Sequence, residues 1–340
     1  MTSTYDRLLA RRSRCFGAVA LAGISILLTG CGGAVTPTGS SASLQGGRSH
    51  VTMCGKAATY PATVRRIVAL NPGQADLVAR LGAGRAVVGV AQTDGQPVPP
   101  SVSSAGGNPR VLSTMGPPAR EALLAAQPDL VLSPTTYEFT GEKGYATQEQ
   151  LTAAGASTYV AAAGCPARRS TAEVTDLLSD IDALGAILHV QPAAAELRRQ
   201  AEAQLRAAAD RARGKPQPTM AQLFVEGDTI TAIGAGVEHS IGKAAGGRSV
   251  FTPQDPAFAS FFAAEVSRET LLAKNPEVIV FGTTGPEHEH RTREWLRRNL
   301  PDIKAVRASR LVGIPAAQLL PGTWGNLDAV TTINAALYPG

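Results

Sequence analysis

Residues 121–132 read EALLAAQPDLVL, and residues 269–280 read ETLLAKNPEVIV. Each stretch starts with an apolar, helix-forming run, breaks at a proline followed by an acid, and ends in a short aliphatic run. This order predicts a helix, a turn and a buried strand, because proline ends a helix and parallel strands are continuously apolar. The recurrence of the unit far along the chain predicts two α/β lobes of similar construction.

Strands and helices alternate on both sides of the first unit. Residues 66–70 (RIVAL) and 87–90 (VVGV) are β-branched runs that indicate strands, with a helix expected at 74–81 between them. A helix that closes at 151–155 precedes a further strand at 158–160. This rhythm predicts a parallel sheet with crossover helices in the first lobe.

The stretch between the two lobes predicts a long amphipathic helix. Ser170 and Glu173 have the spacing of a capping box, and apolar residues recur every three or four positions over residues 174–188. A second helix is expected at 193–212, and a strand at 223–225 then opens the second lobe. Since a single helical connection resists large bending, we expect lobe closure to be small.

The first thirty residues have the organisation of an export signal. Several arginines precede a short apolar run at 18–28, and small residues follow it. The apolar run is too short to remain as a membrane-spanning helix. The string Leu28-Thr29-Gly30-Cys31 resembles the lipobox of bacterial lipoproteins, which implies that Cys31 is diacylated and becomes the new N-terminus. An ordinary signal peptide with an accidental cysteine is the alternative.

The charge balance argues against a nucleic-acid partner. The chain carries 32 lysines and arginines against 27 aspartates and glutamates, a formal net charge of +5. Four of those arginines and one aspartate lie in residues 1–30, so most of the excess leaves with the signal peptide. No aromatic-interleaved basic stretch occurs elsewhere. An apolar content of 44% and a charged content of 17% suit a globular protein.

The motifs of common enzymes are missing from the sequence. It contains no Gly-x-Ser-x-Gly elbow, no phosphate-binding Gly/Lys loop and no His-Glu-x-x-His. Carboxylates are plentiful, but no pair of them is set apart by its spacing. We therefore expect a protein that is not an enzyme and that needs no cofactor.

Four cysteines are present, and two of them belong to the N-terminal segment. Cys54 and Cys165 then remain as an even pair in an oxidising compartment, which favours a disulfide. A free buried pair is the alternative. A metal site at either cysteine is not expected, because neither has a His or Cys neighbour at ligand spacing.

With these motifs in place, the chain resembles the substrate-binding lipoproteins of ABC importers that have a helical backbone. Those proteins carry ferric siderophores, haem or cobalamin. The resemblance covers about residues 52–340, and its carriers are RIVALN at 66–71, LGAGRAVVGV at 81–90, EALLAAQPDLV at 121–131 and VSRETLLAKNPEVIV at 266–280. The two cysteine positions and the ending LPGTWGNLDAV at 320–330 look most like an actinobacterial branch.

The resemblance implies two parallel-sheet α/β lobes joined by a single long helix, with the ligand cleft between the lobes. The expected organisation is a signal peptide at 1–30, a lipidated flexible tether at 31–53, an N-terminal lobe at 54–169, a connecting helix at 170–191 and a C-terminal lobe at 192–340. The implied function is capture of a metal chelate, first of all an iron(III)-siderophore, for an ABC importer at the outer face of the cell membrane. A haem or cobalamin binder of the same fold, or a non-transporting sensor or scaffold, is the alternative.

In such proteins a glutamate on the outer face of each lobe pairs with arginines of the permease dimer. The matching residues here are Glu121 and Glu269, each seven positions before a proline–acid pair. Two carboxylates on similar rigid elements provide a two-point, charge-assisted dock. The alternative is that each glutamate only complements the dipole of its own helix.

The ligand contacts are expected in the loops that follow the carboxyl ends of the strands. The candidates are Asn71, Gln92, Thr93, Thr136, Tyr137 and Phe139 in the first lobe, and Glu238, His239, His288, Arg291 and Trp324 in the second. Tyr137 and Trp324 are expected to stack on a ligand ring, and Arg291 to meet an acidic siderophore. Packing at the lobe edge is the alternative for each aromatic residue.

The string Glu287-His288-Glu289-His290 also raises a metal hypothesis, since imidazoles and carboxylates bind zinc and manganese. Between residues 51 and 188 the first lobe contains no histidine. It therefore offers no imidazole to a metal held between the lobes, and a solvated loop is the preferred interpretation of the string.

Overall fold

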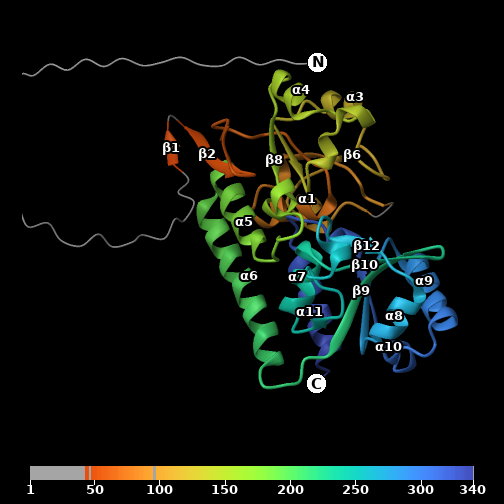
Figure 1. The fold of residues 1–340 in the computed structure, drawn as a ribbon. Coiled ribbons are helices and arrows are strands. Elements are labelled where there is room, and N and C mark those ends of the chain that lie inside the picture. The colour runs from red at the N-terminus through yellow and green to blue at the C-terminus, as the bar shows by residue number, and fades with distance from the viewer. Residues whose placement is uncertain (1–42, 46, 95–96, 340) are drawn as a thin grey trace, which may run out of the picture. The chain divides into compact units, whose positions relative to one another are not determined.

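A computed structural model describes residues 43–45, 47–94 and 97–339. The predicted signal peptide, Cys31 and most of the predicted tether lie outside the described residues. In the part of the chain that is described, none of the helices has the length and apolar character needed to span a bilayer. Figure 1 follows the chain from β1 (Ser43–Gln45) to α11 (Gly325–Leu337).

The first lobe contains a five-stranded sheet in the order β6–β5–β4–β7–β8. Its strands run parallel, as predicted, whereas β6 was not expected from the sequence. Its strands are β4 (Ile67–Ala69), β5 (Val87–Val90), β6 (Arg110–Val111), β7 (Leu130–Ser133) and β8 (Ser157–Val160). Its helices are α1 (Pro72–Arg80), α2 (Pro100–Ser104), α3 (Arg120–Ala125) and α4 (Gln148–Ala153). Every residue of β4 and β7 is buried, which accounts for their unbroken apolar sequences.

The second lobe has a mixed sheet, whereas the sequence predicted parallel sheets in both lobes. β9 (Thr219–Glu226), β13 (Val278–Thr283) and β14 (Leu311–Pro315) run parallel. β10 (Thr229–Ile233) runs antiparallel to β9, because only Gly227 and Asp228 connect the two strands. β12 (Ala263–Glu265) extends this antiparallel edge, and β11 (Arg248–Ser249) pairs with the start of β9. The helices of this lobe are α7 (Gly236–Ala244), α8 (Arg268–Lys274), α9 (Pro286–Asn299), α10 (Lys304–Arg307) and α11.

A β-hairpin precedes the first lobe. β2 (Arg48–Met53) and β3 (Lys56–Tyr60) pair antiparallel, and β1 adds a third strand. The buried Ser49 hydroxyl donates a hydrogen bond to the carbonyl of Ala186 at 2.6 Å. The predicted tether is therefore too long at its C-terminal end, because residues 48–53 form a strand. The sequence of β2 is mostly polar and so does not indicate that one face of the strand packs against the helix that contains Ala186.

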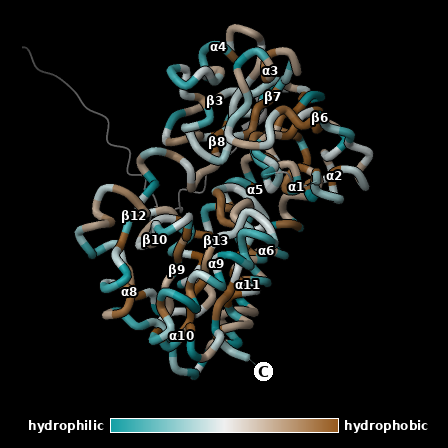
Figure 2. Tube along the Cα trace, turned by 90° about the vertical axis from the view of Figure 1, so that its right-hand side faces the viewer, coloured by the Kyte–Doolittle hydropathy of each residue, from teal (hydrophilic) through white to brown (hydrophobic). Residues whose placement is uncertain are grey.

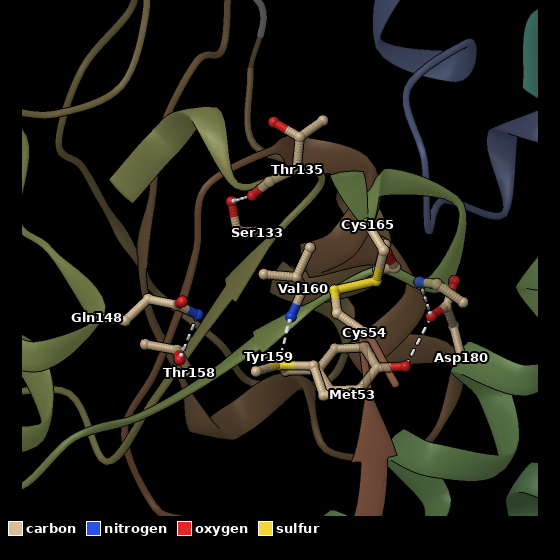
Figure 3. Close-up of a disulfide and its surroundings, with 12 residues drawn as sticks. Met53, Cys54, Ser133, Thr135, Gln148, Thr158, Tyr159, Val160, Cys165 and Asp180 are labelled. Atoms are coloured by element: carbon tan, nitrogen blue, oxygen red, sulfur yellow. Dashed lines mark hydrogen bonds between the residues drawn. A yellow bond between two sulfur atoms is a disulfide. The ribbon is translucent and has the colours of Figure 1, made fainter. Parts of the chain in front are cut away.

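Cys54 and Cys165 form the predicted disulfide, with an S–S distance of 2.04 Å (Figure 3). The bond joins the turn of the hairpin to the loop that follows β8. Next to it, the backbone N–H of Val160 donates to the sulfur of Met53 at 3.2 Å. The Tyr60 hydroxyl donates to the carbonyl of Thr158 at 3.0 Å. Covalent and hydrogen bonds thus fix the hairpin to β8.

Two helices, drawn in green in Figure 1, connect the lobes. α5 (Asp176–Ile187) and α6 (Gln191–Ala212) are separated at His189, whose φ of 57° is left-handed. The predicted capping box does not form, because α5 begins at Asp176 rather than after Ser170. The carboxylate of Glu173 instead accepts a hydrogen bond from the hydroxyl of Ser240. Glu173 therefore binds a residue distant in the sequence instead of the nearby backbone at Ser170.

The largest hydrophobic core includes residues of both lobes and of the connecting helices. Leu77 of α1, Ile181 of α5 and Leu327 of α11 all belong to it and are fully buried. Figure 2 shows hydrophobic and hydrophilic stretches alternating along the surface helices, as expected of helices with one buried face. A core shared in this way resists separation of the lobes.

Candidate functional site

The loops after β4, β5 and β7 meet at one edge of the first sheet. The side-chain nitrogen of Gln92, after β5, donates to the carbonyl of Leu70, after β4, at 2.6 Å. The same nitrogen lies 3.4 Å from Oε1 of Glu138, in the loop after β7. The structure therefore brings these predicted loops together, as parallel strands require.

Glu138 is a buried carboxylate that the sequence reasoning missed. Its side chain is 5% exposed, and Oε2 accepts hydrogen bonds from the hydroxyls of Ser133 at 3.0 Å and Thr135 at 2.6 Å. The hydroxyl of Thr135 also accepts a hydrogen bond from the N–H of Tyr137 at 3.0 Å. Glu138 thus fixes the loop that carries Tyr137. In the sequence, Ser133 and Thr135, five and three positions before Glu138, could have indicated this role.

Tyr137 is the most accessible of the candidates in this lobe, with 41% of its surface exposed. Its ring meets that of Tyr145 edge-on at 5.9 Å between centroids. The ammonium of Lys143 lies 3.3 Å from the Tyr137 hydroxyl and 4.8 Å from the ring centroid. A hydrogen bond with Tyr145 and then the one with Lys143 lower the pKa of the Tyr137 phenol. This cluster is suited to polar contacts at the edge of the lobe.

Three other candidates of the first lobe are buried. Asn71 is the N-cap of α1, and its Oδ1 accepts from the N–H of Gly73 at 2.7 Å. Thr93 and Phe139 are also almost fully buried. All three side chains are buried within their loops, and their direct contact with a ligand stays a prediction.

Trp324 is buried at the start of α11 rather than exposed beside Tyr137. Only 6% of its surface is accessible, and the guanidinium of Arg80 lies 4.9 Å from its ring centroid. The face of the ring is thus already covered by a cation. In this conformation the structure does not bring Trp324 and Tyr137 together as a stacking pair.

Glu238 and His239 lie on α7, next to the segment that leads from the first lobe into α5. Burial raises the pKa of Glu238 to about 7. Burial also lowers the pKa of His239, against the opposing effect of the Glu173 charge. A carboxyl and an imidazole with such displaced pKa values are typical of functional sites.

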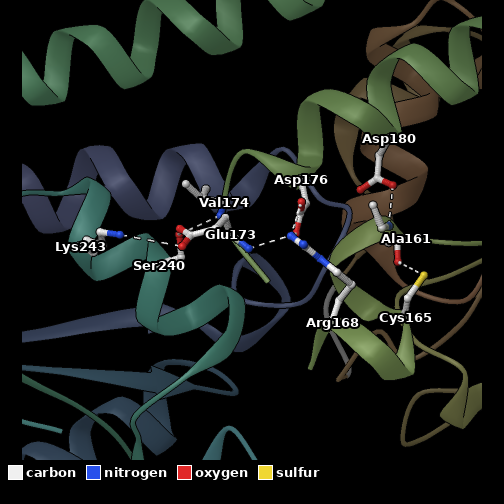
Figure 4. A network of polar contacts seen from close by, with 10 residues as sticks. Ala161, Cys165, Arg168, Glu173, Val174, Asp176, Asp180, Ser240 and Lys243 are labelled. Atoms are coloured by element: carbon white, nitrogen blue, oxygen red, sulfur yellow. Dashed lines mark hydrogen bonds and ion pairs between the residues drawn. The ribbon is translucent and has the colours of Figure 1, made fainter. Parts of the chain in front are cut away.

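Polar contacts fasten this connecting segment, residues 168–176, to α7 (Figure 4). The Ser240 hydroxyl accepts a hydrogen bond from the N–H of Val174 at 2.9 Å and donates one to Glu173. The ammonium of Lys243 lies 3.8 Å from the same Glu173 carboxylate. Arg168 binds both oxygens of Asp176, at 2.6 and 2.7 Å. The connecting segment is therefore held rigidly against the second lobe.

His288 has a structural role in α9. Its Nδ1 accepts a hydrogen bond from the N–H of Thr284 at 3.3 Å, so its Nε2 must carry the proton that it donates to the carbonyl of Val225 at 2.9 Å. Both ring nitrogens are occupied, and the side chain is buried. Neither nitrogen is free to bind a metal. Arg291 is exposed on the same helix and pairs with Glu287 at 3.3 Å.

The string Glu287-His288-Glu289-His290 forms the first turn of α9 and not a loop. Glu289 pairs with Arg293 at 2.6 Å, and His290 with Glu294 at 3.3 Å. Across residues 43–45, 47–94 and 97–339, no three His, Cys, Asp or Glu side chains are gathered as a metal site.

Glu121 and Glu269 occupy equivalent places in two matching units. Each lies in the first turn of a short helix, α3 or α8, that precedes a buried parallel strand. Both carboxylates are exposed, and hydrogen bonding to the backbone at the start of the helix lowers both pKa values. Glu121 is also paired with Arg120 at 2.7 Å. A hollow of about 400 Å³, lined in part by Leu124 and Gln127, lies near the end of α3.

Comparisons with known proteins agree with this architecture. A family model described as periplasmic binding protein matches residues 67–318. No curated protein matches the chain. Among solved structures, a periplasmic binding protein from Veillonella parvula superposes with a TM-score of 0.72 at 18% identity, covering 85% of this chain and 97% of that one.

Two further solved structures have names that refer to iron or haem. An ABC-type Fe3+-hydroxamate transport system protein from Saccharomonospora viridis has a TM-score of 0.67 at 23% identity, covering 84% of this chain and 98% of that one. A periplasmic heme binding protein from Pseudomonas aeruginosa has a TM-score of 0.66 at 22% identity, covering 82% and 94%. At these identities the likeness concerns the fold.

Proposed function

Because the chain belongs to the periplasmic binding protein family, we propose that it captures an iron(III)-siderophore outside the cytoplasm and delivers it to an ABC importer. The observation that carries the proposal is the pair of matching units, α3–β7 and α8–β13, with Glu121 and Glu269 in equivalent, exposed positions. Such a pair fits a partner that contacts both lobes at once with basic side chains.

The choice of an iron chelate is supported by the neighbours in structure. The Saccharomonospora viridis protein is named for Fe3+-hydroxamate transport, and the Pseudomonas aeruginosa protein for heme binding. Haem is therefore the second candidate cargo, ahead of cobalamin. The proposed binding requires no covalent step, and Tyr137 is the most accessible first-lobe candidate for contact with the chelate.

We propose a lipid anchor at Cys31 as the attachment to the membrane. The arginine-rich start, the short apolar run and the Leu-x-Gly-Cys string support it. A Cys31→Ala variant should be released into the soluble extracytoplasmic fraction or stay uncleaved, and should not incorporate labelled palmitate. Incorporation of the label into that variant would contradict the assignment.

Thermal unfolding tests the proposed cargo directly. The chain from residue 32 onward, with its disulfide intact, would be melted with ferric siderophores, haem, cobalamin, and free zinc, manganese and iron. A ligand present at a hundred times its Kd adds about 2.7 kcal/mol of apparent stability. Stabilisation by an iron chelate supports the proposal. Stabilisation by zinc or manganese alone, or by none of the compounds, contradicts it.

A further inference from the structure

An exposed cation–aromatic group lies where the connecting segment meets the second lobe. The guanidinium of Arg169 lies 6.0 Å from the ring centroid of Phe261, just before β12. Phe262 packs on Phe261 with 4.4 Å between centroids, and Phe261 remains 41% exposed. An exposed ring beside a cation can take part in both stacking and charge-assisted contacts with a ligand.

The backbone beneath this group is fixed from several sides. The N–H of Gly236 donates to the carbonyl of Ser170 at 3.4 Å, and the N–H of Gly234 donates to the carbonyl of Phe262 at 2.9 Å. A Cβ on Gly236 would lie 2.5 Å from the carbonyl oxygen of Arg169 and 3.2 Å from Cβ of Phe262. The connecting segment, α7 and the strand edge are therefore in close contact. A site on such a frame is preorganised, which lowers the cost of binding.

The charges around the group favour an anionic occupant. The guanidinium of Arg168 is neutralised by Asp176, and Lys243 by Glu173. Among the residues that the structure describes, no carboxylate lies at ion-pair distance from Arg169. Arg169 is the uncompensated cation here.

We propose that Arg169, Phe261 and Phe262 form a subsite for an anionic aromatic group of the carried solute. The inference rests on the proposed function and narrows its ligand class. Anionic oxygens accept charge-assisted hydrogen bonds from the guanidinium, and the aromatic ring stacks on Phe261. A catecholate chelate and a porphyrin that bears carboxylates both have this chemistry. An aliphatic hydroxamate chelate has no aromatic ring and no such charge.

Equilibrium titrations with three probes test the subsite. The protein from residue 32 onward would be titrated with a ferric tris-catecholate complex, with haemin and with the aliphatic hydroxamate ferrioxamine B. One of the two anionic aromatic probes should bind more tightly than ferrioxamine B. Arg169→Gln should weaken that binding about tenfold or more, as expected for loss of a charge-assisted hydrogen bond. Phe261→Ala should weaken it as well. If the variants lose affinity for the tris-catecholate complex, the anionic ring is a catecholate; if they lose affinity for haemin, it is a porphyrin.

Matched variants separate the subsite from general effects. Arg199→Gln removes an exposed arginine on α6, and Leu272→Ala removes an exposed apolar side chain on α8, so both should leave the affinity unchanged. Unchanged melting temperatures of Arg169→Gln and Arg169→Lys show that the fold is intact.

Two results overturn the subsite and leave the proposed function standing. One is an unchanged affinity of Arg169→Gln and Phe261→Ala for an aromatic chelate that the wild type binds. The other is binding of ferrioxamine B alone. A wild type that binds none of the probes and no other iron chelate overturns the proposed function itself.

Discussion

The carboxylate of Asp180 on α5 accepts a 2.7 Å hydrogen bond from the hydroxyl of Tyr159 on β8, and both side chains are buried. The same Oδ1 accepts from the N–H of Ala162 at 2.8 Å, while Oδ2 has no partner among the described residues. A Cβ on Gly322 would lie 3.5 Å from Oδ2. Asp180 thus lies where the first lobe, the connecting helix and the loop before α11 meet.

This position predicts a pH dependence of stability. Burial raises the pKa of Asp180 from 3.8 to about 7, so the folded protein binds its proton more tightly than the unfolded chain. The free energy of unfolding should therefore rise as the pH falls from 8 to 5, by roughly 2–4 kcal/mol for this group. Urea unfolding at several pH values measures it.

The variant Asp180→Asn separates this group from other acids. It should flatten the pH dependence between 5 and 8 and gain stability at pH 8, because it removes the buried charge. Glu238, whose pKa burial also raises to about 7, contributes with the same sign. Adding Glu238→Gln should therefore remove more of the slope. An unaltered slope in the double variant would show that neither carboxyl is responsible.

The disulfide is expected to contribute substantially to stability. It links residues 111 positions apart, and loops of that length lose about 4–5 kcal/mol of chain entropy when closed. The Cys54→Ser, Cys165→Ser double variant should lose stability of this order in urea unfolding. Added reductant should destabilise the wild type and leave the double variant unaffected. Equal stability of the two proteins without reductant would contradict the expectation.

The docking role proposed for Glu121 and Glu269 predicts a separation of uptake from binding. Glu121→Ala with Glu269→Ala should abolish iron uptake in cells, because two charge-assisted contacts with the permease are lost. Chelate affinity should stay unchanged, since both residues are exposed at the start of outer helices. Glu149→Ala with Glu287→Ala, which removes an exposed acid from the first turn of one helix in each lobe, is the control and should transport normally. Reduced chelate affinity in the first pair would mean that these residues are not docking groups.

His288 predicts a stability effect without a metal effect. His288→Phe keeps a ring against Phe224, 5.3 Å away, but removes the hydrogen bonds to Thr284 and Val225. Loss of two buried partners should cost about 1–3 kcal/mol. His290→Phe, at an exposed position on the same helix, should cost little. Zinc affinity that falls with His288→Phe would contradict the structural role assigned to this side chain.

The sequence predicted the elements whose pattern is local. The strand expected at 87–90 matches β5 residue for residue, and the proline–acid repeat correctly marked β7 and β13. The predicted capping box was wrong because the Glu173 carboxylate accepts a hydrogen bond from the hydroxyl of Ser240, 67 positions further along the chain. Local spacing cannot show a partner so distant in the chain.

The candidate site was predictable only in part, for a similar reason. Strand ends identified the loops that carry Gln92 and Tyr137, but burial decides which side chains stay accessible. Trp324 is covered by Arg80, and Glu138 is buried under its own loop. The sequence did not predict the β2–β3 hairpin, because the hairpin is short, mostly polar and stabilised by contacts with α5 and Cys165.

Isothermal titration calorimetry of the wild-type protein with iron chelates tests the central claim most directly. One ferric siderophore, or haem, should bind with a single site and a Kd of micromolar or tighter, while the iron-free ligand binds more weakly. A well-folded protein that gives no binding heat with any iron chelate, haem or cobalamin at several temperatures would contradict a role in chelate capture.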